Sequence, residues 1–509
     1  MVVTVIAALC LLGLAPVLAA LGGLVEQPSA LIDVLGSGRT WSLWAGTMAL
    51  GLATAGCCAA LGVPVARCLA RRGGGLAATL ATLLPLPLIL PPWVAGVSWT
   101  RLVTLNGFWG STLLLSLSLW PLVALFALRG FRAHATAIDA ARLDRGRGAA
   151  FRAVDLPLAG PSILAGMLLV FVFSITDFGV VDFLSFYDPQ PFTVLSSEIF
   201  QQWSRMDRAA EAAAVSLPTI APALLALWLV LRLERRHEGR LRGRGDDRPD
   251  AVPGRAAGSV GLLAVLLLML APLLVLITWT LRGGREAWAT AWTASTRDSA
   301  LVSVGTSLGA GLIVALLGVA VARVSLRHRR LALPVLALAL LPLAAPSVML
   351  GMGEVRFWNA PWNPLSDAVY LSPWLLVLAT SGRFVALGAL AARALLLRQD
   401  PTPDEAAALV PRPAWQRWLA VSLPRRMPAL GLALALGYLL SMRELELVVT
   451  TPAGSDTLTH RIFSMVHIGS DEVTAALCLA LVALVIVPAA VARLLGVPGV
   501  DCGPRSRGP

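Results

Sequence analysis

The chain contains no lysine, so its count of 41 lysine and arginine residues consists entirely of arginine. The phosphate-binding motif GxxxxGK[ST] needs a lysine, so the chain cannot hold the phosphates of ATP in that way. Charged residues make up only 14% of the sequence, against roughly 25% in a typical soluble protein. These two shortages exclude a nucleotide hydrolase of that type and an ordinary soluble domain.

Cysteine and histidine are scarce, with six and five residues. The cysteines lie in apolar segments, at their ends or in the tail, so no disulfide framework is predicted. A soft-metal site at Cys57, Cys58 and Cys68 is the alternative to their role as small apolar helix residues, which we favour. No Ser, His and Asp share a predicted face. The sequence therefore predicts neither an enzyme nor a firmly assigned metal site or cofactor in this chain.

Apolar residues are abundant: 57% of the chain is hydrophobic, with a mean hydropathy of +0.76. Windows of about 20 such residues are long enough to cross ~30 Å of hydrocarbon as a helix. Backbone in lipid must satisfy its own hydrogen bonds, which selects helices. The sequence thus predicts an all-α polytopic membrane protein. Twelve spans are predicted, at about 2–22, 42–66, 76–99, 111–131, 160–184, 211–233, 259–281, 300–322, 331–352, 371–392, 428–448 and 473–496.

The first of these segments has an alternative interpretation as a signal peptide that ends near residue 20. It lacks a basic stretch at its start, so we expect a retained span. The formal net charge of +12 would suggest nucleic-acid binding in a soluble protein. Here the arginines gather in alternate loops: in the first half, 17 lie in one set and 4 in the other. This positive-inside asymmetry predicts cytoplasmic N- and C-termini and no nucleic-acid partner.

Internal repetition divides the chain. VARCLARRGG at 65–74 matches VARVSLRHRR at 321–330, and LPLILPPWVAG at 86–96 matches LPLAAPSVMLG at 341–351. Leu195 similarly aligns with Leu458. The sequence therefore predicts two copies of one six-span unit, both running in the same direction across the membrane. The predicted domains are 1–233, a charged Gly- and Pro-rich cytoplasmic linker at 234–258, and 259–509.

A polar, arginine-rich stretch follows the fourth span of each copy. It reads DAARLDRGRGAAFRAVDLPLAGP at 139–161 and DEAAALVPRPAWQRWLAVSLPRRMP at 404–428. Each begins with good helix formers and an acid in the first turn. A Gly- or Pro-containing break follows, and then a second helical piece with an aromatic residue and Leu-Pro. The pattern predicts a helix-turn-helix at the membrane face, shaped to dock on a twofold-symmetric partner rather than only to join two spans.

This pattern resembles the EAA loop of binding-protein-dependent ABC import permeases. In that family the loop is the coupling helix, which sits in a groove on the ATP-binding subunit. The first copy has Asp in place of Glu and is one residue shorter, and the second has proline where glycine is expected. The resemblance assigns to the coupling loops Asp139, Ala140, Ala141, Gly146, Phe151, Leu156 and Pro157, and Glu405, Ala406, Ala407, Pro411, Trp418, Leu423 and Pro424.

Two further stretches, TDFGVVDFLSF with FTVLSSEIFQQW and MRELELVVTTPAGSDTLTHRIF, resemble the ferric-iron branch of these permeases. The resemblance implies a bacterial cytoplasmic membrane, a separate homodimeric ATP-binding subunit that holds ATP and Mg, and an extracytoplasmic substrate-binding protein. Ferric iron is the implied substrate, with thiamine, polyamine, phosphonate and sulfate as alternatives. A twelve-span secondary transporter is the alternative from another class, and a membrane-embedded enzyme lacks any site motif.

Ionisable groups inside spans are costly and are therefore candidates for the substrate pathway. Asp177 and Glu444 each lie 20 residues after the Leu-Pro proline of their copy, towards the outer end of a span. Asp182, Arg443 and Glu446 are their neighbours. A hard trivalent cation prefers carboxylate oxygen to sulfur or imidazole. The alternative is that these acids mark the water line or pair locally with arginine.

Arg383 lies in the middle of a predicted span, where we expect it to face the bundle and pair or line water. His460 and His467 are seven residues apart in an exterior loop, so two helical turns would place them on one face. A metal contact there is the alternative to two solvated histidines, which we favour.

Overall fold

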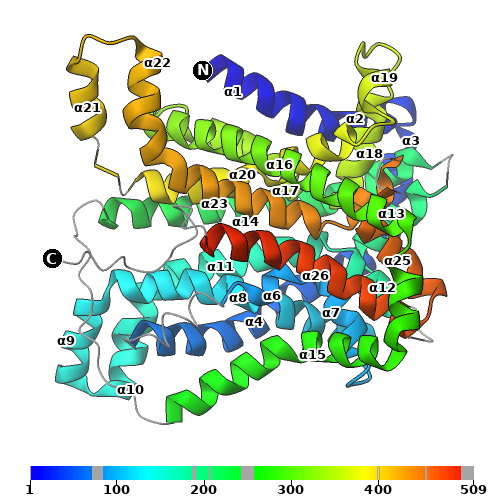
Figure 1. Cartoon of the computed structure of the whole chain (residues 1–509), viewed down its shortest axis with the longest axis horizontal. Helices are drawn as coiled ribbons and strands as arrows, with labels where there is room; N and C mark the ends of the chain where they lie inside the picture. The colour runs from blue at the N-terminus through cyan, green and yellow to red at the C-terminus, as the bar shows by residue number, and fades with distance from the viewer. Residues whose placement is uncertain are drawn as a thin grey trace.

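The structure, a computed structural model, describes residues 2–71, 84–185, 188, 191–205, 208–241, 257–397, 399–400, 402–452 and 456–494. This part of the chain is helical and contains no strand (Figure 1). Eight of its helices are long and apolar enough to cross a membrane, and a bent pair makes a ninth span if counted as one. The predicted all-α polytopic fold is confirmed.

The longer helices are α1 (Val2–Leu9) continued through η1 (Cys10–Leu14) into α2 (Ala15–Glu26), α4 (Gly38–Arg71), α8 (Gly107–Ala133), α11 (Leu156–Thr176), α14 (Ala209–Leu241), α15 (Ala257–Ala291), α16 (Ala294–Arg327), α17 (Ala332–Ala344), α18 (Ser347–Trp358), α20 (Trp374–Leu396), α23 (Leu423–Met442) and α26 (Asp471–Leu494). The shorter ones outside the two loops described below are α3 (Ser29–Gly36), α6 (Leu86–Ile89), α7 (Pro92–Trp99), α12 (Gly179–Ser185), α13 (Leu195–Trp203), α19 (Ser366–Val369), α24 (Glu446–Thr450) and α25 (Leu458–Ile468).

Nine of the twelve predicted spans correspond to these candidate membrane helices. The predicted span 259–281 lies within α15 and 473–496 overlaps α26, but some of their side chains lie outside the described residues. The predicted span 76–99 is described only from residue 84 onward. α14 continues to Leu241, into the predicted linker 234–258. Its charged residues are good helix formers, so the helix runs on past the apolar segment.

The third and ninth predicted spans are broken rather than continuous. α17 and α18 meet at an angle of 101°, and α6 and α7 are separated in the same way. Proline precedes each second helix: Pro91 has φ −55° and ψ 137°, and Pro346 has φ −51° and ψ 136°. Proline lacks the N–H that a continuous helix needs, and it pushes the preceding residue out of the helical region. The two positions, aligned in sequence, thus have the same extended backbone.

The first helix of each half packs against the other half. α2 lies on α18, and α15 lies on α7. At one crossing, the Ser98 hydroxyl donates to the Pro272 carbonyl at 3.0 Å. At the other, Gly353 approaches Pro16 so closely that an added Cβ would lie 2.0 Å from the Pro16 carbonyl oxygen. Small residues permit such close helix contact in membranes.

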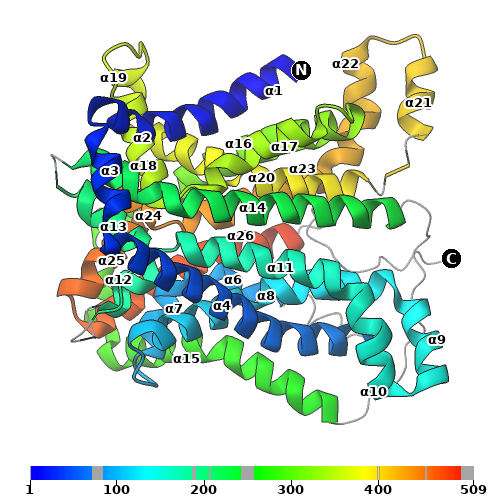
Figure 2. The ribbon, with the colours of Figure 1, turned by 180° about the vertical axis from the view of Figure 1, so that it is seen from behind.

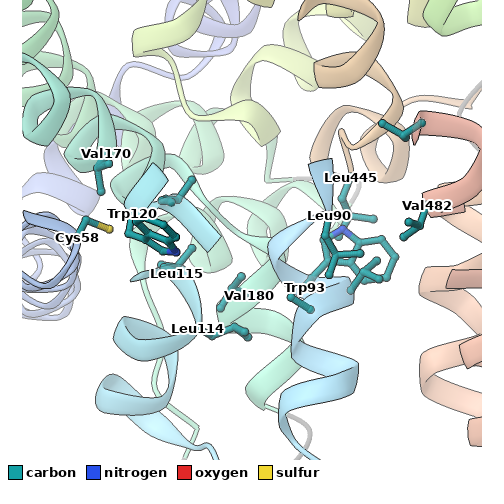
Figure 3. Close-up of a cluster of buried hydrophobic side chains, with 14 of the residues drawn as sticks. Cys58, Leu90, Trp93, Leu114, Leu115, Trp120, Val170, Val180, Leu445 and Val482 are labelled. Carbon is teal, nitrogen blue, oxygen red and sulfur yellow. The ribbon is translucent and has the colours of Figure 1, made fainter. Parts of the chain in front are cut away.

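The largest apolar core joins residues of both halves. Figure 3 shows Leu445 of the second half beside Leu90 and Trp93 of the first, with Val482 across from them. Trp120 and Cys58 pack in another part of the same cluster. Because lipid tails are as apolar as these side chains, helix association here depends on close packing and on polar contacts.

Candidate functional site

Two loops protrude from the same end of the molecule, at opposite corners in both views (Figures 1 and 2). We call residues 135–155 the first loop and 402–422 the second loop. The first consists of α9 (Ala135–Arg145), α10 (Arg147–Ala150) and the π-helix η2 (Phe151–Asp155). The second consists of α21 (Thr402–Leu409), α22 (Ala414–Arg417) and the π-helix η3 (Trp418–Ser422). The two loops therefore have the same order of elements.

Each loop enters the following span through a π-turn at the same place. The N–H of Leu156 donates to the carbonyl of Phe151, and the N–H of Leu423 donates to the carbonyl of Trp418. Each leucine is followed by a proline that offers no N–H, which accounts for a wider turn ahead of it. The Leu-Pro pairs then start α11 and α23, so each loop continues without a break into a long helix.

The first helix of each loop presents an exposed leucine near its end. Leu143 is 92% exposed and Leu409 is 87% exposed, and the two are aligned in sequence, each four residues after the acid of its motif. Ala140, Glu405 and Ala406 are exposed on the same helices. The side chain of Asp139 lies outside the described residues. A single exposed apolar side chain is common on a protein surface, so the feature to explain is that both loops present one at the same place.

The turns of the two loops differ, as the sequence suggests. Gly146 has φ +76°, which L-residues rarely adopt. The second loop has Pro411 there instead, and no non-glycine residue in the described part of the chain has a positive φ. Arg417 compensates, because its guanidinium donates to the carbonyl of Ala408 at 2.8 Å, near the end of α21.

Each loop is tied to the bundle by an arginine–aspartate contact. In the first loop, Arg67 of α4 lies 3.3 Å from the buried Asp155 and stacks on Phe151. In the second, Asp404 accepts from Arg425 at 3.0 Å and also from the Ser422 hydroxyl. The aromatic residues of the two loops, Phe151 and Trp418, differ in their surroundings. Phe151 is half-buried, and the guanidinium of Arg67 lies over its ring.

Trp418 is 42% exposed in the described structure. In the second loop Asp404 contacts Arg425 and also Arg426, at 3.4 Å.

At the opposite end, the structure brings most of the pathway candidates together. Glu444 Oε2 lies 3.6 Å from Nε of Arg383, and both side chains are almost fully buried. Asp177 follows α11 and lies within electrostatic reach of Arg383, Arg443 and Glu446. One Asp177 oxygen accepts from the Val180 N–H at 2.9 Å. Asp177 and Glu444 thus each lie within electrostatic reach of Arg383 in one mixed-charge cluster.

Two members of this cluster bind backbone groups of the other half. The N–H of Phe178 donates to Glu446 at 3.1 Å, and the Arg443 guanidinium donates to the carbonyl of Leu88. Asp182 lies further on, half-buried in α12. The span 160–184 predicted to contain Asp177 ends instead at Thr176, because the chain turns extended at Asp177.

The remaining candidates stay apart from this cluster. His460 and His467 both lie on α25, and burial lowers the pKa of His460. Within the described residues, no three His, Cys, Asp or Glu side chains are placed to hold a metal ion. Sequence reasoning missed Glu354, which is 1% exposed and accepts from Trp358 Nε1 at 2.8 Å. The available signal was an acid within the apolar stretch that follows Pro346.

No model of a known protein family matches the chain. A protein of Haloferax volcanii described as a "probable molybdenum ABC transporter permease protein" is 32% identical over 142 residues. The match covers 25% of this chain and 53% of that protein, so the chain aligns with about half of the relative's length. Part of this chain is thus homologous to an ABC transporter permease, the class that the loop pattern resembles. The relative's name gives molybdenum, not iron.

Proposed function

We propose that this chain is the membrane-spanning permease subunit of an ATP-driven ABC importer. The observation that carries the proposal is the pair of loops at one end of the molecule, with the same order of elements and the aligned exposed residues Leu143 and Leu409. The partial similarity to an ABC permease supports the same assignment. The matching backbone at Pro91 and Pro346 supports the proposal that the halves 1–233 and 259–509 are copies of one unit.

In this proposal the two loops dock on a separate, homodimeric ATP-binding subunit, which holds ATP and Mg. Two loops of like shape suit two identical grooves. When ATP closes the dimer, the loops move together, and α11 and α23 carry the movement to the charged cluster at the far end. The partner thereby shifts the population between two states of the bundle. A substrate-binding protein delivers the substrate at that far end.

The orientation follows from the arginine asymmetry. It places both loops and both termini in the cytoplasm and the charged cluster towards the exterior, in a bacterial cytoplasmic membrane. The second loop is the better docking element by sequence, because Glu405 and the spacing to Pro424 follow the family pattern. The first loop keeps the exposed leucine although its acid is Asp139.

The substrate proposal has two candidates. Ferric iron is the first, because a hard cation prefers the carboxylate oxygens that Asp177 and Glu444 offer and because the sequence resembles the ferric-iron branch. Molybdenum, as the oxyanion molybdate, is the second, and the name of the relative favours it. Arg383 and Arg443 are the side chains of the cluster that suit an anion.

Co-purification with the ATP-binding subunit tests the assignment. Leu143→Asp combined with Leu409→Asp should abolish co-purification, because each substitution places a charge in an apolar contact. Leu371→Asp is the matched control, since Leu371 is 77% exposed between α19 and α20, away from both loops. Retention of the ATP-binding subunit by the double variant would refute the docking role.

Uptake by cells with and without the chain tests the substrate. Radiolabelled ferric iron and radiolabelled molybdate are compared at fixed ATP, and a loop variant serves as the negative control. Loss of only one of the two activities on deletion identifies the substrate. Loss of neither would discard both candidates and direct the search to thiamine, polyamines, phosphonate and sulfate.

A further inference from the structure

We propose that Arg443 and Glu446 form a latch that holds the exterior end of the two halves closed, and that ATP-driven movement of the loops must open it. The proposal rests on the permease function proposed above. It differs from a substrate contact, because both side chains end on backbone groups of the other half.

The first group is the carbonyl of Leu88, in α6. In a continuous helix this carbonyl would accept from the N–H three or four residues further on. Those positions are Pro91 and Pro92, and proline has no N–H. The break between α6 and α7 therefore leaves the Leu88 carbonyl without a helical donor. Arg443, at the end of α23 in the other half, supplies that donor.

The second group is the N–H of Phe178. α11 ends at Thr176, and Asp177 has an extended ψ of 131°, so the Phe178 N–H is turned out of the helix. A buried backbone donor without a partner is costly. The carboxylate of Glu446, itself 8% exposed, accepts from it at 3.1 Å. In both bonds, a side chain of the second half thus pairs with a backbone group of the first half that a helix break leaves without a helical partner.

The arrangement is one-sided. When the two halves are aligned on Pro157 and Pro424, Arg443 corresponds to Thr176 and Glu446 to Gly179. The Thr176 hydroxyl donates back to the Val172 carbonyl of its own helix at 2.9 Å, and Gly179 has no side chain. A structural requirement common to both halves would place like groups in both. The latch residues occur only in the second half.

Arg443 lies within electrostatic reach of Glu444, Asp177 and Glu446, and Arg383 lies 3.6 Å from Glu444 within the second half. Charge-assisted hydrogen bonds in a buried setting are stronger than neutral ones. Removal of either latch side chain leaves a buried backbone group without its partner.

The location of the contacts between halves supports a gate at this end. Arg101 pairs with Asp471, and Arg356 pairs with Glu26, so these contacts also join the first half to the second at the end away from the loops. Both of these pairs are more exposed and are therefore weaker. The loops lie at opposite corners of the other end (Figure 1). These charged contacts thus join the halves at the far end, while an apolar cluster with Leu231 of the first half and Val335 of the second joins them elsewhere.

Basal ATP hydrolysis tests the latch. The full chain is purified with its ATP-binding subunit, in lipid, and hydrolysis is measured without the substrate-binding protein. Arg443→Met and Glu446→Ala should each raise this basal rate by about fivefold or more. A weaker latch lowers the free energy that is needed to close the ATPase dimer. Thr176→Val is the matched control, since it removes a hydrogen bond at the corresponding position within one helix, and it should leave the rate unchanged.

Loss of uptake with an unchanged basal rate in the two latch variants would overturn the proposal and indicate a substrate contact instead. If the permease function itself is wrong, no ATPase co-purifies with the wild-type chain. This result differs from failure of the latch, in which the ATPase co-purifies and the variants keep the wild-type basal rate. A reversible cross-link covers the case in which a latch variant does not fold.

The cross-link uses Gly179→Cys combined with Leu445→Cys. A Cβ at Gly179 would lie 2.9 Å from a methyl carbon of Leu445 across the junction, and removal of the leucine makes room for both sulfurs. Oxidation, which forms the disulfide, should lower uptake about tenfold. Treatment with a reducing agent, which cleaves it, should restore uptake. The two single cysteine variants control for the native cysteines. Full uptake by the cross-linked protein would show that the halves need not separate there, and the latch would be refuted.

Discussion

Arg67 of α4 is held between two residues of the first loop: its guanidinium carbon lies 3.8 Å from the centroid of the Phe151 ring, and Nη2 lies 3.3 Å from Oδ2 of Asp155. Asp155 is fully buried. A planar guanidinium can stack on an aromatic ring and bind a carboxylate at once. This contact fixes the first loop to the second predicted span.

Substitution of Arg67 should therefore destabilise the loop and its junction. Arg67→Ala removes the partner of a buried charge, and such losses cost about 3–5 kcal/mol. Arg67→Lys should recover only part of this, because an ammonium keeps the charge and loses the stacking. The measurement is the midpoint of thermal unfolding of the purified chain in detergent. Arg39→Ala is the control, since its pair with Glu198 is on the surface and is worth at most about 1 kcal/mol.

The close contact of Gly353 with Pro16 leads to a second prediction. Gly353→Ala would place a methyl group 2.0 Å from a backbone oxygen, so α2 must move away from α18. Overpacking of this kind costs about 1–3 kcal/mol. Gly305→Ala in α16 is the matched control, because no atom lies within 4 Å of its added Cβ, and alanine favours a helix over glycine by up to about 1 kcal/mol. A thermal midpoint that falls equally in both variants would contradict the packing argument.

Much of this architecture could be predicted from the sequence, because lipid leaves few choices for the backbone. Apolar length located α8, α16 and α20, and the Leu-Pro pairs located the starts of α11 and α23. The limits of the fifth span could not be predicted, since the apolar run continues past the break at Asp177. At that break the Phe178 N–H donates to Glu446, a contact across 268 positions that no local pattern contains.

The charged cluster was only partly predictable. Equal spacing from Pro157 and Pro424 related Asp177 to Glu444, because the same sequence pattern precedes both acids. The contact of Arg443 with the carbonyl of Leu88 joins residues 355 positions apart, and no local pattern contains it. The buried pairing of Asp155 was missed for a similar reason: its partner lies on α4, and a short polar loop gives no sign of burial.

The turn of the first loop leads to a third prediction. Gly146→Val must adopt φ +76° with ψ 167°, a region essentially confined to glycine, at a cost of about 1–3 kcal/mol. The first loop should then lose its shape, and less ATP-binding subunit should co-purify per chain. Pro411→Ala is the control in the second loop, where the turn needs no positive φ, and it should retain the partner. Equal retention by both variants would show that docking does not depend on the turn.

Asp177 and Glu444 supply the last prediction, on the substrate pathway. Asp177→Asn combined with Glu444→Gln keeps the shape of both side chains and removes two negative charges from the cluster. If a cationic substrate passes them, uptake should fall by about tenfold or more, since a lost charge contact with a cation is worth several-fold in affinity at each site. Membrane level and co-purified ATPase should stay normal, which separates transport from assembly. Glu354→Gln is the control, because this buried acid contacts Trp358 of its own helix. Normal uptake of the substrate by the double variant would remove these two acids from the pathway and leave them as partners of Arg383 and Arg443.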